Sequence, residues 1–109
     1  MTAKEYLSQI KKINTQIRNK KYELKELQES GLNVGPVLET MSKLDIEKRK
    51  IIGTIERLPE AEYDVLHKVY VQYLTLQEVA ADRDISYSLA ATIHGRALKR
   101  LECLINANP

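Results

Sequence analysis

The feature that most constrains the fold of this 109-residue chain is its first thirty residues, which contain no glycine and no proline. Most positions there carry Lys, Glu, Gln, Ile or Leu, which favour helix. One set of residues recurs alternately three and four apart, as in the seam of a coiled coil. This seam consists of Ala3, Tyr6, Ile10, Ile13, Ile17, Lys20, Leu24 and Leu27. The spacing predicts one long helix that begins at the capping residue Thr2 and ends near Gly31.

The same rhythm returns after a break at residues 30–36 and predicts a second helix. Its seam consists of Val37, Met41, Leu44, Lys48, Ile51, Ile55 and Leu58. The two seams can be paired so that the residue numbers of each pair add to 68, as in an antiparallel hairpin. This pairing sets Lys20 against Lys48, whose ammonium groups we expect to turn toward Glu23, Glu47 or water. The short connection favours pairing within one chain, and pairing between two chains is the alternative.

A different pattern begins at Leu58-Pro59, because proline suits the first turn of a new helix. The chain then carries three further helical segments with these inward-facing stripes: Tyr63, Leu66, Val69, Tyr70, Tyr73 and Leu74; Leu76, Val79 and Ala80; and Ala90, Ile93, Ala97, Leu101 and Leu104. Thr75 with Glu78 forms a capping box, and Ser86 is a good N-cap for the last helix. The prediction is an all-α chain: an antiparallel, coiled-coil-like hairpin over residues 1–57, followed by a three-helix helix-turn-helix over residues 58–109.

Residues 58–102 resemble region 4 of the sigma-70 family factors. The likeness rests on the stretches LPEAEYDVL from Leu58, LTLQEVA from Leu74, Ile85-Ser86, and RALKRL from Arg96. Within that family the chain is similar to small phage-encoded proteins, the late-transcription regulators of the ArpU kind, which join a sigma-like C-terminus to a helical extension. The resemblance implies DNA binding in transcription control and contact with RNA polymerase.

The resemblance also implies that the helix after Ser86 faces duplex DNA. The residues expected on that surface are Ser86, Tyr87, Ser88, Ala91, Thr92, Arg96 and Lys99. In helix-turn-helix docking the start of the second helix enters the major groove, so Ser86 suits a phosphate contact and Ala91 a thymine methyl. Arg96 and Lys99 lie further along and suit phosphates better than bases. The alternative is that Ser86 is only a cap and that both cations belong to a solvated helix face.

Two residues depart from the family pattern in the turn. Asp84 stands where the family usually has glycine, so we expect an aspartate in left-handed geometry. Arg83 stands where an apolar residue commonly packs. Either its guanidinium reaches a phosphate, or Arg83 is simply a surface residue that replaces the apolar one.

Charge divides the chain into two unlike parts. Residues 1–57 hold 12 basic and 8 acidic side chains, a net charge of +4, whereas residues 58–109 hold 5 and 7, a net charge of −2. Phosphate neutralisation supplies most nonspecific DNA affinity, so the C-terminal part alone should bind weakly and lose that binding quickly as salt rises. The first two helices carry cations that form either an auxiliary basic surface or a soluble exterior: Lys11, Lys12, Arg18, Lys20, Lys21, Lys25, Lys48, Arg49 and Lys50.

Other functions find no support in the sequence. The single Cys103 forms no internal disulfide, the start lacks a signal pattern, and no apolar run suits a membrane, so we expect a protein of the bacterial host cytoplasm. His67 and His94 are isolated, which predicts no enzyme, no metal and no cofactor. Three functions remain: a DNA-binding transcriptional regulator whose hairpin is a spacing arm or forms a homodimer, a sigma-like docking module for RNA polymerase or another phage protein, and a structural adaptor.

Overall fold

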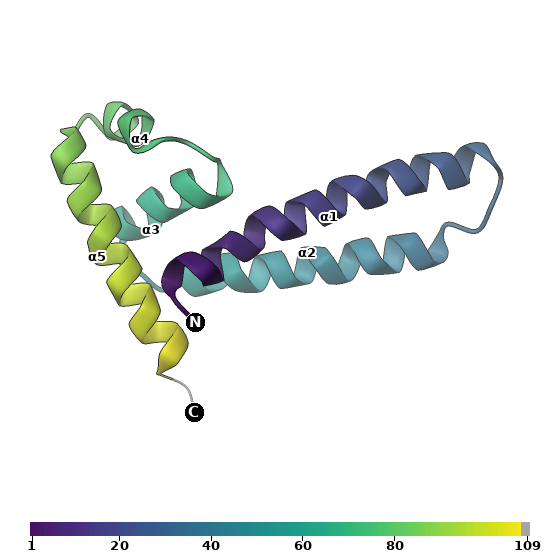
Figure 1. Ribbon diagram of the computed structural model, residues 1–109, viewed down its shortest axis with the longest axis horizontal. Helices are drawn as coiled ribbons and strands as arrows, with labels where there is room; N and C mark the ends of the chain where they lie inside the picture. Colours follow the sequence, from purple (N-terminus) through teal and green to yellow (C-terminus); the bar gives the residue numbers. More distant parts are fainter. Residues whose placement is uncertain (108–109) are drawn as a thin grey trace.

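The computed structural model describes residues 1–107, and this part of the chain contains helices and no strand (Figure 1). In chain order the elements are α1 (Ala3–Glu29), α2 (Gly35–Ile55), α3 (Glu60–Leu66), the π-helical η1 (His67–Val71), α4 (Leu76–Arg83) and α5 (Tyr87–Asn106). The predicted all-α fold is confirmed. None of these helices is long and apolar enough to cross a bilayer.

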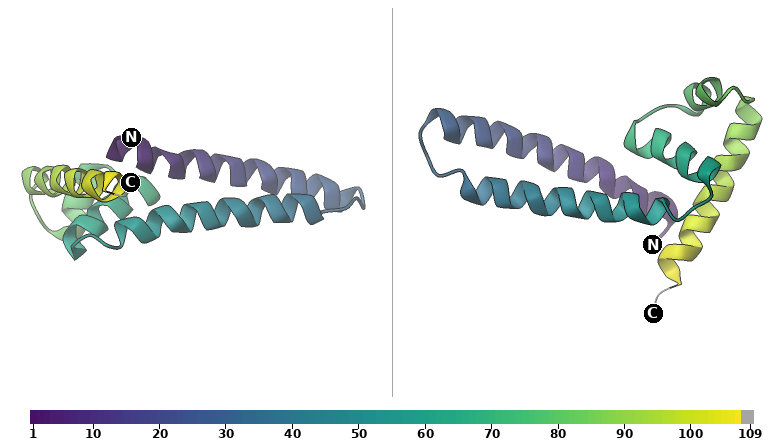
Figure 2. Two further views of the ribbon diagram at one scale, coloured as in Figure 1. Left: turned by 90° about the horizontal axis from the view of Figure 1, so that it is seen from below. Right: turned by 180° about the vertical axis from the view of Figure 1, so that it is seen from behind.

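Helices α1 and α2 lie side by side and antiparallel within one chain, as all three views show (Figures 1 and 2). At the start of α1 the Thr2 hydroxyl accepts a hydrogen bond from the Glu5 amide at 3.1 Å. At its end Gly31 adopts a φ of 67°, and the Leu32 amide donates to the Leu27 carbonyl, which closes a Schellman motif. Every predicted seam residue of both helices is buried or half-buried.

The register of the hairpin differs from the prediction. The Tyr6 hydroxyl donates to Thr54 Oγ1 at 2.9 Å, whereas the predicted pairing would place Thr54 opposite Asn14, about 12 Å further along α1. Pairs whose numbers add to 61 put Tyr6 opposite Ile55, next to Thr54. A seam that repeats every heptad matches itself equally well after a slip of seven, and the apolar pattern does not distinguish the two registers. Lys20 and Lys48 are therefore not opposed, although Lys20 does pair with Glu23 at 2.9 Å as expected.

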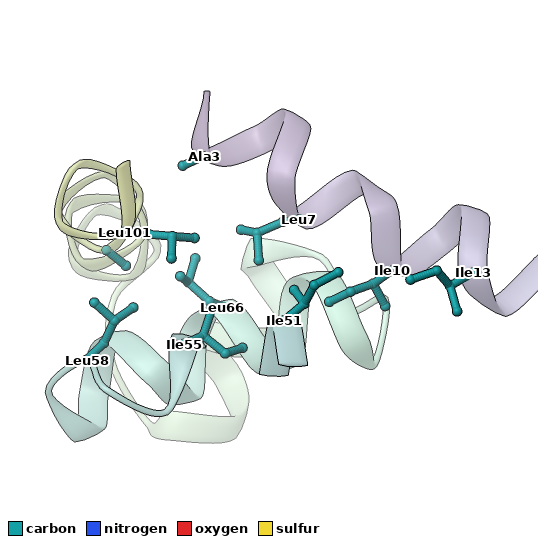
Figure 3. Packing of buried hydrophobic residues seen from close by; sticks show 10 residues of the cluster. Ala3, Leu7, Ile10, Ile13, Ile51, Ile55, Leu58, Leu66 and Leu101 are labelled. Carbon is teal, nitrogen blue, oxygen red and sulfur yellow. The ribbon is translucent and has the colours of Figure 1, made fainter. Parts of the chain in front are cut away.

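The open end of the hairpin shares one hydrophobic core with the C-terminal helices (Figure 3). Leu7 of α1, Ile55 of α2, Leu66 of α3 and Leu101 of α5 meet there, each with at most 1% of its surface exposed. Leu58 packs on the α5 side of this cluster, away from Ile10, its predicted partner (Figure 3). The hairpin thus packs against the rest of the molecule at its open end, where α1 begins and α2 ends.

The continuous apolar stripe predicts one regular helix after Pro59. The structure differs, because this segment is not one regular helix. Helix α3 passes into the wider η1 turn, in which the Gln72 amide donates to the His67 carbonyl. The η1 turn ends at Val71, and two residues later Tyr73 has a φ of 61°. This left-handed residue turns its side chain out of the core and leaves it 52% exposed, so the prediction that Tyr73 is buried is wrong.

Candidate nucleic-acid interface

Local capping interactions position α5. Thr75 and Glu78 form a complete capping box at the start of α4, as predicted. At the end of α4, Asp84 adopts φ 56° and ψ 47°, and the Ile85 amide donates to the Ala80 carbonyl. The Ser86 hydroxyl then accepts a hydrogen bond from the Leu89 amide at 3.1 Å and starts α5. The tight turn between α4 and α5 therefore follows from a left-handed residue and an N-cap only two positions apart.

The residues predicted to face DNA lie along one exposed side of α5, which we call the α5 face. Ser86, Tyr87, Ser88, Thr92, Arg96 and Lys99 are exposed, and Ala91 is half-buried among them. The opposite side packs inward through Ala90, Ala97 and Leu101, none of which is accessible. Helices α1 and α2 leave the α5 face uncovered, so its side chains can reach a ligand.

The α5 face is the positive part of the C-terminal helices. No acidic residue occurs between Asp84 and Glu102. Within residues 1–107, Arg96 and Lys99 make no ion pair, whereas Arg100 donates to Glu62 at 2.8 Å. Glu62 is only 8% exposed, so Arg100 neutralises a buried carboxylate and ties α5 to α3. Arg96 and Lys99 are left to attract an anion.

Arg83 does not point toward a phosphate. Its guanidinium contacts Asp64 at 2.7 Å and Glu60 at 3.3 Å, both on α3, and Lys68 bridges Asp64 to Asp82 of α4. Partial burial would raise the pKa of Asp64, but hydrogen bonds from Lys68 and Arg83 outweigh it and lower that pKa. This network holds α4 against α3, and the phosphate hypothesis for Arg83 is wrong because carboxylates from another helix occupy the guanidinium.

His94 is a packing residue between η1 and α5. Its ring stacks on Tyr70 with centroids 5.8 Å apart, and its Nε2 lies 3.0 Å from the Tyr70 hydroxyl. Burial, with a smaller effect from the nearby charge of Lys4, lowers the pKa of His94. Burial also raises the pKa of Tyr70. Both groups therefore stay neutral near pH 7, which suits a packed contact that orients α5.

Sequence reasoning did not single out Leu89, which is 45% exposed in the first turn of α5. An apolar side chain at this place adds hydrophobic surface beside Ser88. The sequence does indicate that Leu89 is exposed, because Leu89 lies outside the inward-facing stripe that begins at Ala90.

The helices that form this site also match a known protein family. Residues 54–102 match the Sigma-70, region 4 family, which covers the end of α2 and nearly all of α3 to α5. These residues form a sigma-70 region 4 domain. In sigma factors, region 4 is a DNA-binding helix-turn-helix, and the turn and exposed helix described above agree with that fold.

Curated relatives match the same part of the chain. RNA polymerase sigma factor FliA of Yersinia enterocolitica is 36% identical over 59 residues, which are 54% of this chain and 26% of that protein. FliA of Salmonella typhimurium is 35% identical over 54 residues, 50% of this chain and 23% of its own length. The chain thus spans about a quarter of the length of these relatives. No solved structure matches it significantly.

The likeness to ArpU-type phage regulators stays a prediction, as does the division of the chain at residue 57. The region 4 domain leaves most of the hairpin unmatched.

Proposed function

We propose that this protein is a DNA-binding regulator of transcription that contacts duplex DNA through the α5 face. One observation carries the proposal: the predicted contact residues share one exposed side of a capped helix in a region 4 domain, and two cations there have no ion-pair partner within residues 1–107. A helix-turn-helix places such a helix in the major groove. Ser86, Tyr87, Ser88, Ala91 and Thr92 then lie nearest the bases, while Arg96 and Lys99 hold backbone phosphates.

The hairpin is proposed as a spacing arm. Its seam is closed within one chain, so the apolar surface that would pair two chains is already used. A homodimer through these helices would require their outer faces instead. The proposal includes a phage origin, residence in the bacterial cytoplasm and no catalytic activity.

The proposal can be tested by fluorescence anisotropy with random and genomic duplexes at several salt concentrations. The double variant Arg96→Ala/Lys99→Ala should bind more weakly, and its salt slope should fall by about 0.9 for each phosphate that is no longer neutralised. Lys43→Ala/Lys50→Ala removes the same charge from exposed positions of α2 and serves as the control. An α5 variant that keeps the affinity and salt slope of the control would contradict the proposal.

A second function is favoured by the charge pairing. Three of the five cations in residues 58–109 are Lys68, Arg83 and Arg100, and all three are engaged with carboxylates. Few cations then remain for DNA. Since the relatives are RNA polymerase sigma factors, the alternative is a module that docks on RNA polymerase, with exposed Leu89 in the contact. Binding to core polymerase without measurable duplex binding would favour this alternative.

A further inference from the structure

A positively charged groove lies where the hairpin meets the turn after η1. Two adjoining hollows of about 440 and 310 Å³ share Asn14, Arg18 and Tyr73 in their walls. We call them together the cationic groove, whose polar and charged side chains include Lys11, Asn14, Arg18, Lys21, Lys48 and Tyr73. The groove is formed by α1, α2 and Tyr73, which lies two residues after η1, and it is separate from the α5 face.

The charge of the groove is largely uncompensated. Residues 6–22 of α1 contain five cations and no acidic residue. Within residues 1–107 none of the four groove cations makes an ion pair. The acidic residue in the wall is Asp45, and Arg49 engages it at 2.9 Å. An anion entering the groove therefore meets cations that do not have to leave a carboxylate first.

Tyr73 supplies a second, independent observation. A tyrosine at φ 61° is strained, and such residues persist where the surrounding structure holds them. Here the Leu74 amide donates to the Lys68 carbonyl, and the Asn14 amide group donates to the Tyr73 hydroxyl. The strain places a half-exposed aromatic ring with a hydroxyl at the edge of the cations. Strained residues of this kind cluster at ligand sites.

We propose that the cationic groove binds the phosphate backbone of duplex DNA as a second, nonspecific contact, an inference that rests on the proposed function. Lys11 and Arg18 are seven residues apart on α1, which separates them by about 10 Å. This spacing is longer than a single phosphate group, so the two cations can contact successive phosphates of a backbone. The region 4 side of the chain, residues 58–109, carries a net charge of −2. A second contact on the positive hairpin supplies the cations that this part lacks.

The arrangement of the helices makes the groove a separate surface. Helix α1 runs away from α5 toward the tip of the hairpin, as both broad views show (Figures 1 and 2). The groove therefore holds a stretch of backbone other than the one beneath the α5 face. Removing the cations of one surface should weaken binding without abolishing the interaction at the other.

The test compares two triple variants of the full chain that remove the same charge from exposed positions. Lys11→Gln/Arg18→Gln/Lys21→Gln alters the groove. The α2 variant, Lys43→Gln/Lys50→Gln/Arg57→Gln, instead removes cations of α2 and of the residue two positions after it, none of which lines the groove. Each is titrated against a long random-sequence duplex at several salt concentrations, with circular dichroism to show that the helices are retained. The salt slope of the groove variant should fall by roughly 2 to 3, and that of the α2 variant should fall by much less.

Equal affinity and salt slope in the two triple variants would overturn the groove proposal. Arg96→Gln/Lys99→Gln, measured alongside, separates this failure from a failure of the proposed function. If only the α5 variant weakens binding, the α5 face stands and the groove does not. If only the groove variant weakens it, the groove stands and the α5 assignment fails. A wild-type chain that binds no duplex contradicts both, and an acidic protein partner then becomes the better occupant.

Discussion

At the scale of single residues, Asp84 shows how this chain makes a tight turn without glycine. It is the left-handed residue that ends α4, with φ 56°. Aspartate tolerates this geometry better than most residues, but its Cβ still makes it less favourable than glycine. The resemblance to region 4 predicted this geometry, because Asp84 stands where the family usually has glycine.

We predict that Asp84→Gly stabilises the protein by about 0.5–1 kcal/mol, since glycine removes the left-handed cost. Urea unfolding followed by circular dichroism measures the change. Asp84→Asn is the control, because it removes the charge but keeps the tolerance for left-handed geometry. Stabilisation by asparagine as large as that by glycine would show that charge, not backbone geometry, limits the turn.

His94 gives a pH-dependent stability. Its pKa is lowered in the folded protein from an ordinary value of 6.5, so the unfolded chain binds the extra proton first as pH falls. The stabilisation is complete above about pH 6.5 and decreases as pH falls toward the lowered pKa. We predict that the unfolding free energy of the wild type decreases between neutral and mildly acidic pH, and that His94→Gln reduces this dependence. An unchanged pH profile in the variant would contradict the assignment.

Residues with local partners could be assigned from the sequence, whereas residues with distant partners could not. The caps Thr75 and Ser86 are local, because each bonds an amide three residues on, and they were predicted correctly. Arg83 and Tyr73 depend on partners far along the chain, Asp64 and Asn14. No local pattern shows which helix will lie beside them.

At the scale of elements, the contact between α3 and α4 depends on a charged network. Asp64 is its centre, because it accepts from both Lys68 and Arg83 while only a quarter of its side chain is exposed. Hydrogen bonds between charged groups in such partly buried places contribute more than surface ion pairs do. The network therefore fixes α4, and through the turn at Asp84 it sets where α5 begins.

We predict that Asp64→Asn lowers the unfolding free energy by about 1–2 kcal/mol at neutral pH. The lowered pKa of Asp64 means that this contribution is present above its ordinary value of 3.8 and is lost as pH falls through the folded value. The difference between variant and wild type should therefore shrink in acid. Asp45→Asn, which breaks an exposed pair with Arg49, should change stability by less than about 0.5 kcal/mol. Equal effects of the two variants would show that the network does not hold the helices.

At the scale of the whole molecule, the hairpin and the region 4 domain are joined by a common core. Leu7 illustrates this, because it lies outside the predicted hairpin seam yet is 1% exposed. A seam read from one helix pair identifies only the residues that face the partner helix. The sequence therefore predicted the hairpin and the helix-turn-helix, but not the third surface where α5 and η1 cover the start of α1.

We predict that Leu7→Ala destabilises the whole chain by about 2–5 kcal/mol, with the hairpin and α3 to α5 unfolding in one transition. Leu38→Ala, at a position 47% exposed on α2, should stay within about 0.5 kcal/mol of the wild type. Two separate transitions in the wild type, with Leu7→Ala affecting only one, would contradict a shared core.

The proposed function depends above all on binding of duplex DNA by the α5 face. An NMR titration of the isotopically labelled chain with a duplex, following each backbone amide, tests this binding residue by residue. We predict that the largest chemical-shift changes fall on residues 86–99, with the α2 positions Lys43 and Lys50 unaffected. Changes confined to other helices, with residues 86–99 unmoved at saturation, would contradict it.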